Sequence, residues 1–164
     1  MQTLALDVKR VARERGAHLP QHPMLSHAIL AFTRYWLKLG EGRPPAWADF
    51  DMMGAGDGLP YLTIFKCNGD SSFTIEFTGS AISALAGEDL AGRKVTFIDP
   101  AQGDIDWFER VRTAAKKADI QLSTGTTSPA YTSSLDFVAA DFPFMDDGGH
   151  AVSRVVCLTV PKLN

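Results

Sequence analysis

Residues 61–93 decide the fold, and they read YLTIFKCNGDSSFTIEFTGSAISALAGEDLAGR. Two segments rich in aromatic and β-branched side chains flank Asn68-Gly69, a pair that supplies the positive φ angles of a tight hairpin. In the second segment Phe73, Ile75 and Phe77 alternate with polar residues, which predicts a strand with one buried face and one wetter face. The stretch therefore predicts a β-hairpin in an antiparallel sheet.

A short helix is expected directly after this hairpin. Ser80 can cap its N-terminus, Ile82 and Leu85 supply its apolar residues, and Gly87 ends it. Gly92 then marks a second sharp turn.

The rest of the chain alternates between helical and extended patterns. Helices are predicted at 3–15, 24–39 and 105–118, a short apolar segment at 94–98, and strands at 120–127, 134–143 and 151–160. Strands joined mostly by hairpins imply an α+β fold, in which an antiparallel sheet carries helices on one face.

Several short motifs in a fixed order resemble a PAS domain, and more narrowly a bacterial stand-alone PAS-like family with an N-terminal Tyr-Trp helix. The motifs are Tyr35-Trp36, Arg43-Pro44-Pro45, Ala48-Asp49-Phe50-Asp51, Leu59-Pro60, 73–79 and 87–92. Trp47 and Glu76 stand where this family pattern has a basic residue, so no role of such a residue is carried over. The resemblance implies a PAS-like five-stranded antiparallel sheet in residues 59–164, preceded by a helical extension and linker in residues 1–58.

Composition excludes several classes of function. A net charge of -3 provides no basic footprint for nucleic acid and no polybasic membrane anchor, and no apolar run reaches the ~18 residues of a membrane span. A cytoplasmic protein is therefore expected. Cys67 and Cys157 are read as small buried hydrophobes, because two lone cysteines make no disulfide framework.

No catalytic or metal-binding motif is present. His18, His22 and His27 fit no zinc spacing, and no nucleophile elbow, P-loop or dinucleotide fingerprint occurs. The cofactor is unknown: no histidine is placed to hold a haem axially, and no cysteine lies on the short helix to form a flavin adduct.

Three carboxylates stand out among the acids. Asp136 and Asp141 are an odd number of residues apart on one predicted strand, so they point to opposite faces of the sheet. Glu76 lies in mid-strand, and we expect it on the wetter face, within reach of Arg154.

The resemblance also implies a site, because many PAS domains use the space between the sheet and its helices for a small ligand or cofactor. In this sequence we expect a wall made of Phe73, Ile75, Phe77, Ile82, Leu85, Phe97, Ile98, Phe108, Phe137 and Leu158. The alternative is a core that the same side chains fill completely.

The expected function is a non-enzymatic sensory or adaptor module of bacterial signalling, which acts on a partner protein and binds at most a small apolar ligand. The alternative is a small α+β enzyme with a cone-shaped pocket for a small organic molecule. A homodimer is predicted through the N-terminal helices, because Ile29, Phe32 and Trp36 form an apolar stripe that one sheet need not cover fully. Since no kinase, cyclase or DNA-binding segment is seen, output is expected to be delivered to a separate protein.

Overall fold

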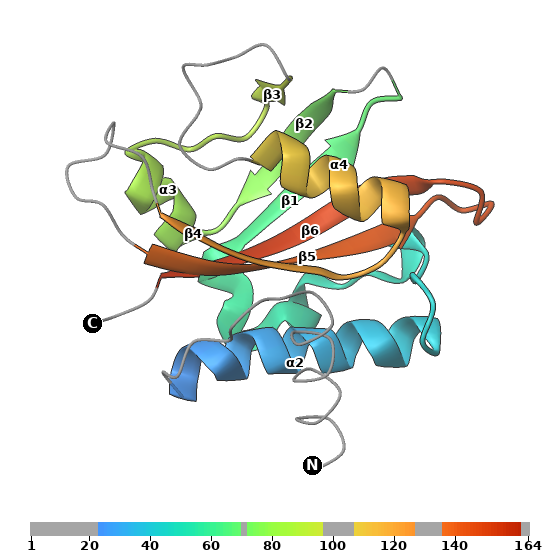
Figure 1. Ribbon diagram of the computed structural model, residues 1–164, viewed down its shortest axis with the longest axis horizontal. Helices are drawn as coiled ribbons and strands as arrows, with labels where there is room; N and C mark the ends of the chain where they lie inside the picture. The colour runs from blue at the N-terminus through green and yellow to red at the C-terminus, as the bar shows by residue number, and fades with distance from the viewer. Residues whose placement is uncertain (1–22, 70–71, 97–106, 127–135, 162–164) are drawn as a thin grey trace.

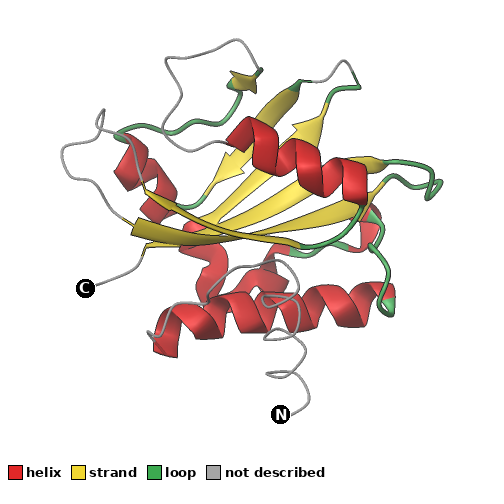
Figure 2. Cartoon of the chain, viewed as in Figure 1, coloured by secondary structure: helices red, strands yellow, loops and turns green. Residues whose placement is uncertain are grey.

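The computed structural model describes residues 23–69, 72–96, 107–126 and 136–161. In these residues one antiparallel sheet lies between two layers of helices (Figures 1 and 2). Its strands, in the order β3-β2-β1-β6-β5-β4, are β1 (Leu62–Cys67), β2 (Phe73–Thr78), β3 (Lys94–Val95), β4 (Gln121–Thr126), β5 (Asp136–Met145) and β6 (Val152–Pro161). The helices are α2 (Pro23–Gly40), the 3-10 helices η1 (Trp47–Asp49) and η2 (Met52–Tyr61), α3 (Ser80–Ala86) and α4 (Trp107–Lys117).

This architecture confirms the α+β class and the antiparallel sheet. Helices cover both faces of the sheet, where the sequence predicted them on one face, because the apolar stripe of α2 packs on the face opposite α3 and α4. The sequence predicted five strands and the sheet has six, because the two residues of β3 pair with Phe73 and Thr74 at the edge of β2. The helix predicted at 3–15 lies outside the described residues.

The turn between β1 and β2 differs from the predicted tight hairpin. Of its described residues only Gly69 has a positive φ, of 81°, and the Asn68 N–H donates to the Ser72 carbonyl. The Asn68 side-chain amide donates to the Ser72 hydroxyl at 3.0 Å and to the Thr74 hydroxyl at 2.9 Å. Asn68 therefore stabilises a longer turn through its side chain, and its own backbone stays out of the left-handed region.

A β-bulge corrects the predicted alternation in β2. The β1–β2 register shifts between Ile64 and Phe65: Ile64 faces Phe77, Phe65 faces Ile75, and Glu76 is the extra residue. A bulge of this kind moves every following side chain to the opposite face. Phe77 therefore packs on the other side of the sheet from Ile75.

The face of the sheet against α2, here called the α2-side face, is apolar where the helix packs on it. Ile29, Phe32 and Trp36 pack into one cluster with side chains of β1, β4, β5 and β6, and they are 0%, 0% and 2% exposed. The predicted dimer contact through these three side chains is therefore wrong. The sheet does cover the stripe, because β1, β4, β5 and β6 carry apolar side chains on this face.

Three hydrogen bonds fasten the α2 end of the chain to the rest. The Trp36 indole N–H donates to the Pro143 carbonyl at 2.8 Å, and the Met145 N–H donates to the Pro45 carbonyl at 2.8 Å. The Asp51 N–H donates to the Tyr35 hydroxyl at 2.7 Å. Since two of these bonds reach β5, α2 and its following linker are part of the same packed body as the sheet.

The opposite face, here called the α4-side face, is covered by α3 and α4 (Figure 1). Val111 and Ala114 of α4 and Ile82 of α3 are buried against it. Gly79, the residue before α3, has the carbonyls of Leu59 and Pro60 so close that an added Cβ would lie 2.3–2.4 Å from them. Only glycine therefore allows β2 to pass so near η2 before α3 begins.

Candidate functional site

Strand register gathers small and polar side chains on the α4-side face. Asp141 of β5 lies opposite Cys157 of β6, and Cys157 lies opposite Thr63 of β1. One step along, Thr159 of β6 lies opposite Ala139 of β5. Residues directly opposite each other on neighbouring strands share a face, so these five side chains form a single patch across three central strands, called here the polar patch.

A buried ion pair from α4 forms one border of the polar patch. The Arg110 guanidinium donates to both Asp141 carboxylate oxygens, from Nη2 at 2.7 Å and from Nε at 3.2 Å. The Asp141 side chain is fully buried and that of Arg110 is 12% exposed. The guanidinium also lies 5.7 Å from the centre of the Phe137 ring, within cation–π range. Two-pronged pairing of this kind fixes both the position of α4 and the orientation of Asp141.

Cys157 is not a reactive thiol. Burial raises its pKa well above the ordinary value, and the neighbouring Asp141 carboxylate raises it further. The thiol therefore stays neutral, as expected for a cysteine that fills space in a core.

Buried hydroxyls are the most unusual chemical feature of this face. In the described part of the chain the hydroxyls of Thr63, Thr159 and Ser123 are buried and have no hydrogen-bond partner. By strand register Ser123 of β4 lies opposite Ala139, so all three hydroxyls belong to the α4-side face. Each such group costs about 1–3 kcal/mol relative to a satisfied one, and so a group of three calls for a partner.

The predicted ligand-wall residues divide between the two faces. Phe73, Ile75, Ile82 and Phe137 are buried on the α4-side face, Phe108 packs against them, and Leu85 is half-buried on α3. Phe77 and Leu158 belong to the α2-side cluster, Phe77 because of the bulge and Leu158 because β6 is apolar on both faces. Phe97 and Ile98 lie outside the described residues.

The polar patch was largely missed by sequence reasoning. The opposite orientations of Asp136 and Asp141 were predicted from their spacing, and Asp141 is indeed buried while Asp136 is exposed. Threonines inside apolar strands give no sequence signal that distinguishes a hydroxyl with a partner from one without. Arg110 gave no signal either, because its partner lies 31 residues away.

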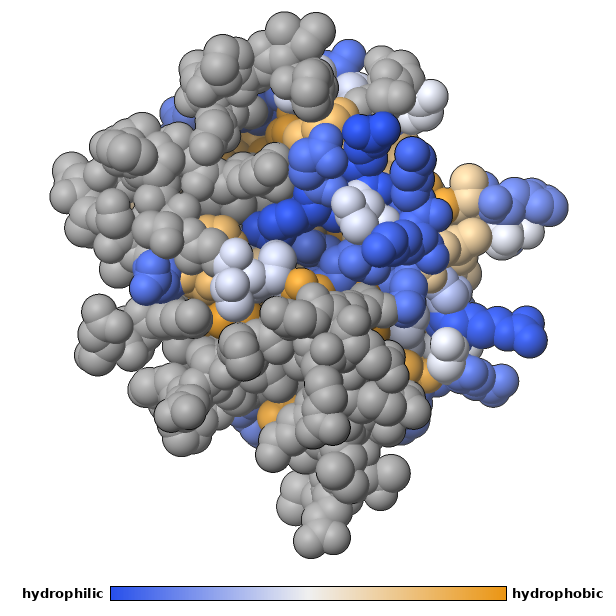
Figure 3. Space-filling model, in the orientation of Figure 1, coloured by the Kyte–Doolittle hydropathy of each residue, from blue (hydrophilic) through white to orange (hydrophobic). Residues whose placement is uncertain are grey.

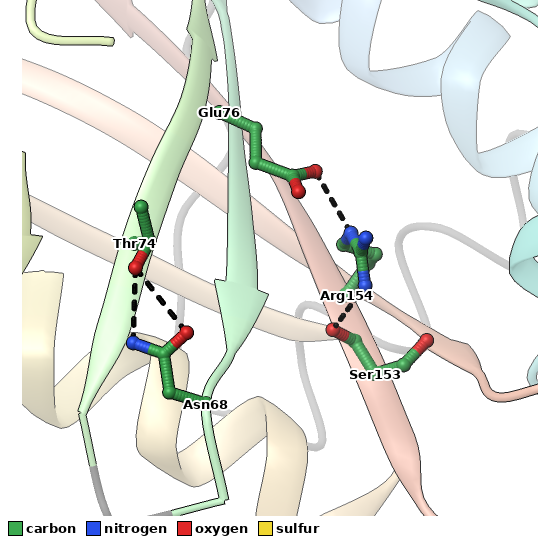
Figure 4. A network of polar contacts seen from close by, with 5 residues as sticks. All are labelled: Asn68, Thr74, Glu76, Ser153 and Arg154. Atoms are coloured by element: carbon green, nitrogen blue, oxygen red, sulfur yellow. Dashed lines mark hydrogen bonds and ion pairs between the residues drawn. The ribbon is translucent and has the colours of Figure 1, made fainter. Parts of the chain in front are cut away.

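The ion pair that the sequence predicted joins β2 and β6 across β1, and Arg154 lies on the α2-side face. The Arg154 Nε donates to Glu76 Oε2 at 2.8 Å, and its Nη1 donates to the Ser153 carbonyl (Figure 4). The Arg154 guanidinium also lies 5.4 Å from the centre of the Trp47 ring. These contacts hold the bulge at Glu76 against β6, so the pair is structural.

The described residues limit the other possible sites. They contain no group of three or more His, Cys, Asp and Glu side chains placed to hold a metal ion. No helix in the same ranges has the length and apolar character that crossing a bilayer requires.

Comparison with known proteins agrees with this geometry. A family model described as "PAS domain" matches residues 24–158. No curated protein matches the chain.

Solved structures are similar to this one at low sequence identity. A variant of the fungal photoreceptor VVD aligns with a TM-score of 0.50 and 11% identity, over 77% of this chain and 91% of that one. The PAS domain of BvgS from Bordetella pertussis aligns with a TM-score of 0.43 and 11% identity, over 66% of this chain and 79% of that one. At 11% identity the likeness to the VVD variant extends to the fold alone.

Proposed function

Because the chain belongs to the PAS domain family, we propose that it is a non-enzymatic sensory or adaptor module. It binds a small ligand against the α4-side face and acts through contact with a signalling protein. The bacterial stand-alone family with a Tyr-Trp helix and a cytoplasmic location are parts of this proposal. Tyr35 and Trp36 fit that family assignment, since each makes a hydrogen bond that joins α2 to a distant segment.

The observation that carries the proposal is the set of buried hydroxyls without partners. A core filled only by side chains gains nothing from Thr63 and Thr159, because valine has nearly the same shape and no hydroxyl to leave unsatisfied. A ligand with hydrogen-bonding groups supplies the missing partners. The sequence suggested an apolar ligand; the hydroxyls favour one that has polar groups beside an apolar body.

The enzyme alternative has one observation in its favour, the buried Asp141 carboxylate on the α4-side face. Both carboxylate oxygens, however, accept hydrogen bonds from Arg110. A general base must also reach the proton that it removes, and the Asp141 side chain is fully buried beside the guanidinium. The ion pair therefore favours the sensory role.

We expect purified protein to retain a small molecule in native mass spectrometry, and a Thr63→Val/Thr159→Val variant to lose most of it. Thr74→Val is the matched control, because the Thr74 hydroxyl is bonded to Asn68, away from the polar patch, and this variant should retain the ligand. A core filled by side chains predicts the opposite. The wild-type mass then includes no bound molecule, and the double valine variant is more stable than wild type by about 1–3 kcal/mol.

Dimerisation remains a prediction, although the apolar stripe on which it was based is buried against the sheet. We expect light scattering at rising protein concentration to show a homodimer that Ile29, Phe32 and Trp36 do not mediate. Exposed substitutions on α2, such as Arg34→Glu, test whether the outer surface of that helix contributes, since Arg34 is exposed. A monomer at every concentration would remove the dimer from the proposal.

A further inference from the structure

A concave site lies at the other end of α4, away from the polar patch. It is a groove of about 530 Å³ between the adjoining ends of β1 and β2 (with Gly69 and Ser72), the C-terminal end of α4 and the β5–β6 turn. Its volume is within the range of small-molecule sites, roughly 300–1,000 Å³.

The groove combines an apolar floor with a cationic rim. Phe73, Ala115 and Val152 contribute to the floor, and Arg112, Lys116 and His150 contribute their side chains around it; no carboxylate is among its described lining residues. Hydrophilic side chains cover the molecular surface over α4 (Figure 3).

The basic side chains are available to a ligand. Lys116 has no ion-pair partner among the residues that the structure describes. Among the described residues Arg112 forms an ion pair with Glu109 alone, at 3.4 Å, and both side chains are 46% exposed. An exposed pair of this kind contributes about 0–1 kcal/mol, so a ligand anion can replace it at little cost.

The β5–β6 turn that supplies His150 is held in place before any ligand binds. The Asp146 carboxylate accepts the His150 backbone N–H at 2.9 Å, and this bond is the main cause that lowers the pKa of Asp146. The His150 ring packs so closely on Gly148 that a Cβ there would lie 2.7 Å from ring atom Cδ2. A pre-formed wall lowers the entropy cost of binding.

Cys67 also lines the groove, but it supplies neither charge nor a nucleophile. Burial raises the pKa of its thiol to about 11, despite the opposing effect of Arg154. The chemistry of the groove is therefore that of cations around an apolar floor.

We propose that this groove binds a small organic acid with an apolar body. The carboxylate faces Arg112, Lys116 and His150, and the body covers Phe73, Ala115 and Val152. The site is separate from the polar patch, so it does not depend on the proposed ligand there. Met145 lines the groove and also donates its N–H to Pro45, so the occupant contacts the residue that fastens the N-terminal linker to β5.

Isothermal titration of the full chain with octanoate tests the proposal. Saturable binding is expected, at least roughly tenfold tighter than that of 1-octanol, which lacks the charge, and of acetate, which lacks the apolar body. Lys116→Glu should weaken octanoate binding by roughly tenfold or more. Lys117→Glu is the matched control, because the neighbouring Lys117 is exposed and does not line the groove. The octanoate affinity of this variant should stay within about twofold of the wild-type affinity.

Each contrary outcome overturns the proposal. Absence of saturable octanoate binding rules out the site, and equal losses in Lys116→Glu and Lys117→Glu indicate attraction to net charge alone. Preference for an acidic peptide over octanoate indicates a protein partner in place of a small acid. The Thr63→Val/Thr159→Val variant should bind octanoate normally, so this result is independent of the polar patch.

Discussion

Asp141→Ala is expected to lower the free energy of unfolding by about 3–5 kcal/mol. The substitution leaves the Arg110 guanidinium, 12% exposed, without the carboxylate that accepts two of its hydrogen bonds. A buried charge that loses its partner keeps the cost of leaving water and loses the compensating attraction. Urea unfolding followed by circular dichroism measures the change.

Two further variants identify the cause of that loss. Replacing both partners, as in Arg110→Met/Asp141→Leu, should restore most of the stability, because a buried ion pair and an apolar pair of similar volume are often equivalent. Glu76→Gln breaks the more exposed pair with Arg154 and should cost only about 0–1 kcal/mol. If the double replacement is as unstable as Asp141→Ala, the pair has a role beyond neutralising charge.

Trp36→Ala should cost about 3–5 kcal/mol, as for other large aromatic side chains removed from a core. The indole is 2% exposed, lies against Phe142 and donates a hydrogen bond to Pro143. The substitution therefore opens a cavity between α2 and the sheet and leaves a buried carbonyl without its donor. Denaturant unfolding of the full chain measures the loss.

Trp36→Phe separates these two contributions. It keeps most of the apolar contact but leaves the Pro143 carbonyl without its donor, for an expected cost of about 1–3 kcal/mol. Lys38→Ala, an exposed change on the same helix, should stay within about 0.5 kcal/mol. A Trp36→Ala variant as stable as the Lys38→Ala control would mean that α2 is not part of the core.

The proposed division into residues 1–58 and 59–164 depends on the same helix. The two parts share one apolar cluster, in which Phe32 packs on Phe142 with ring centres 4.6 Å apart. A chain that begins at residue 59 exposes that face of the sheet to water. Its stability measures whether the second part folds without the first.

Period-two alternation and turn residues were sufficient to predict the α+β class, the positions of the strands and the pairing of Glu76 with Arg154. They failed where a strand is buried on both sides, because alternation then no longer indicates which face is which. Leu158 was misplaced for that reason, and Phe77 because a bulge has no sequence signal at Glu76.

The candidate sites were harder to predict than the fold. The polar patch depends on the register of β1, β5 and β6, which are far apart in sequence. The groove at the end of α4 is formed by residues near the ends of β1 and β2, in the last turns of α4 and in the β5–β6 turn, and these segments meet only after folding. Neither is a local pattern.

Strand β6 has side chains in both apolar layers: Val155 and Cys157 point toward α4, while Val156 and Leu158 point toward α2. The strand separates the two close-packed apolar clusters and contributes side chains to both. Because such interiors have little free volume, a strand that yields to an occupant on one side must alter the packing on the other. We therefore expect a ligand of the proposed kind, bound under α4, to alter the packing of α2 through β6.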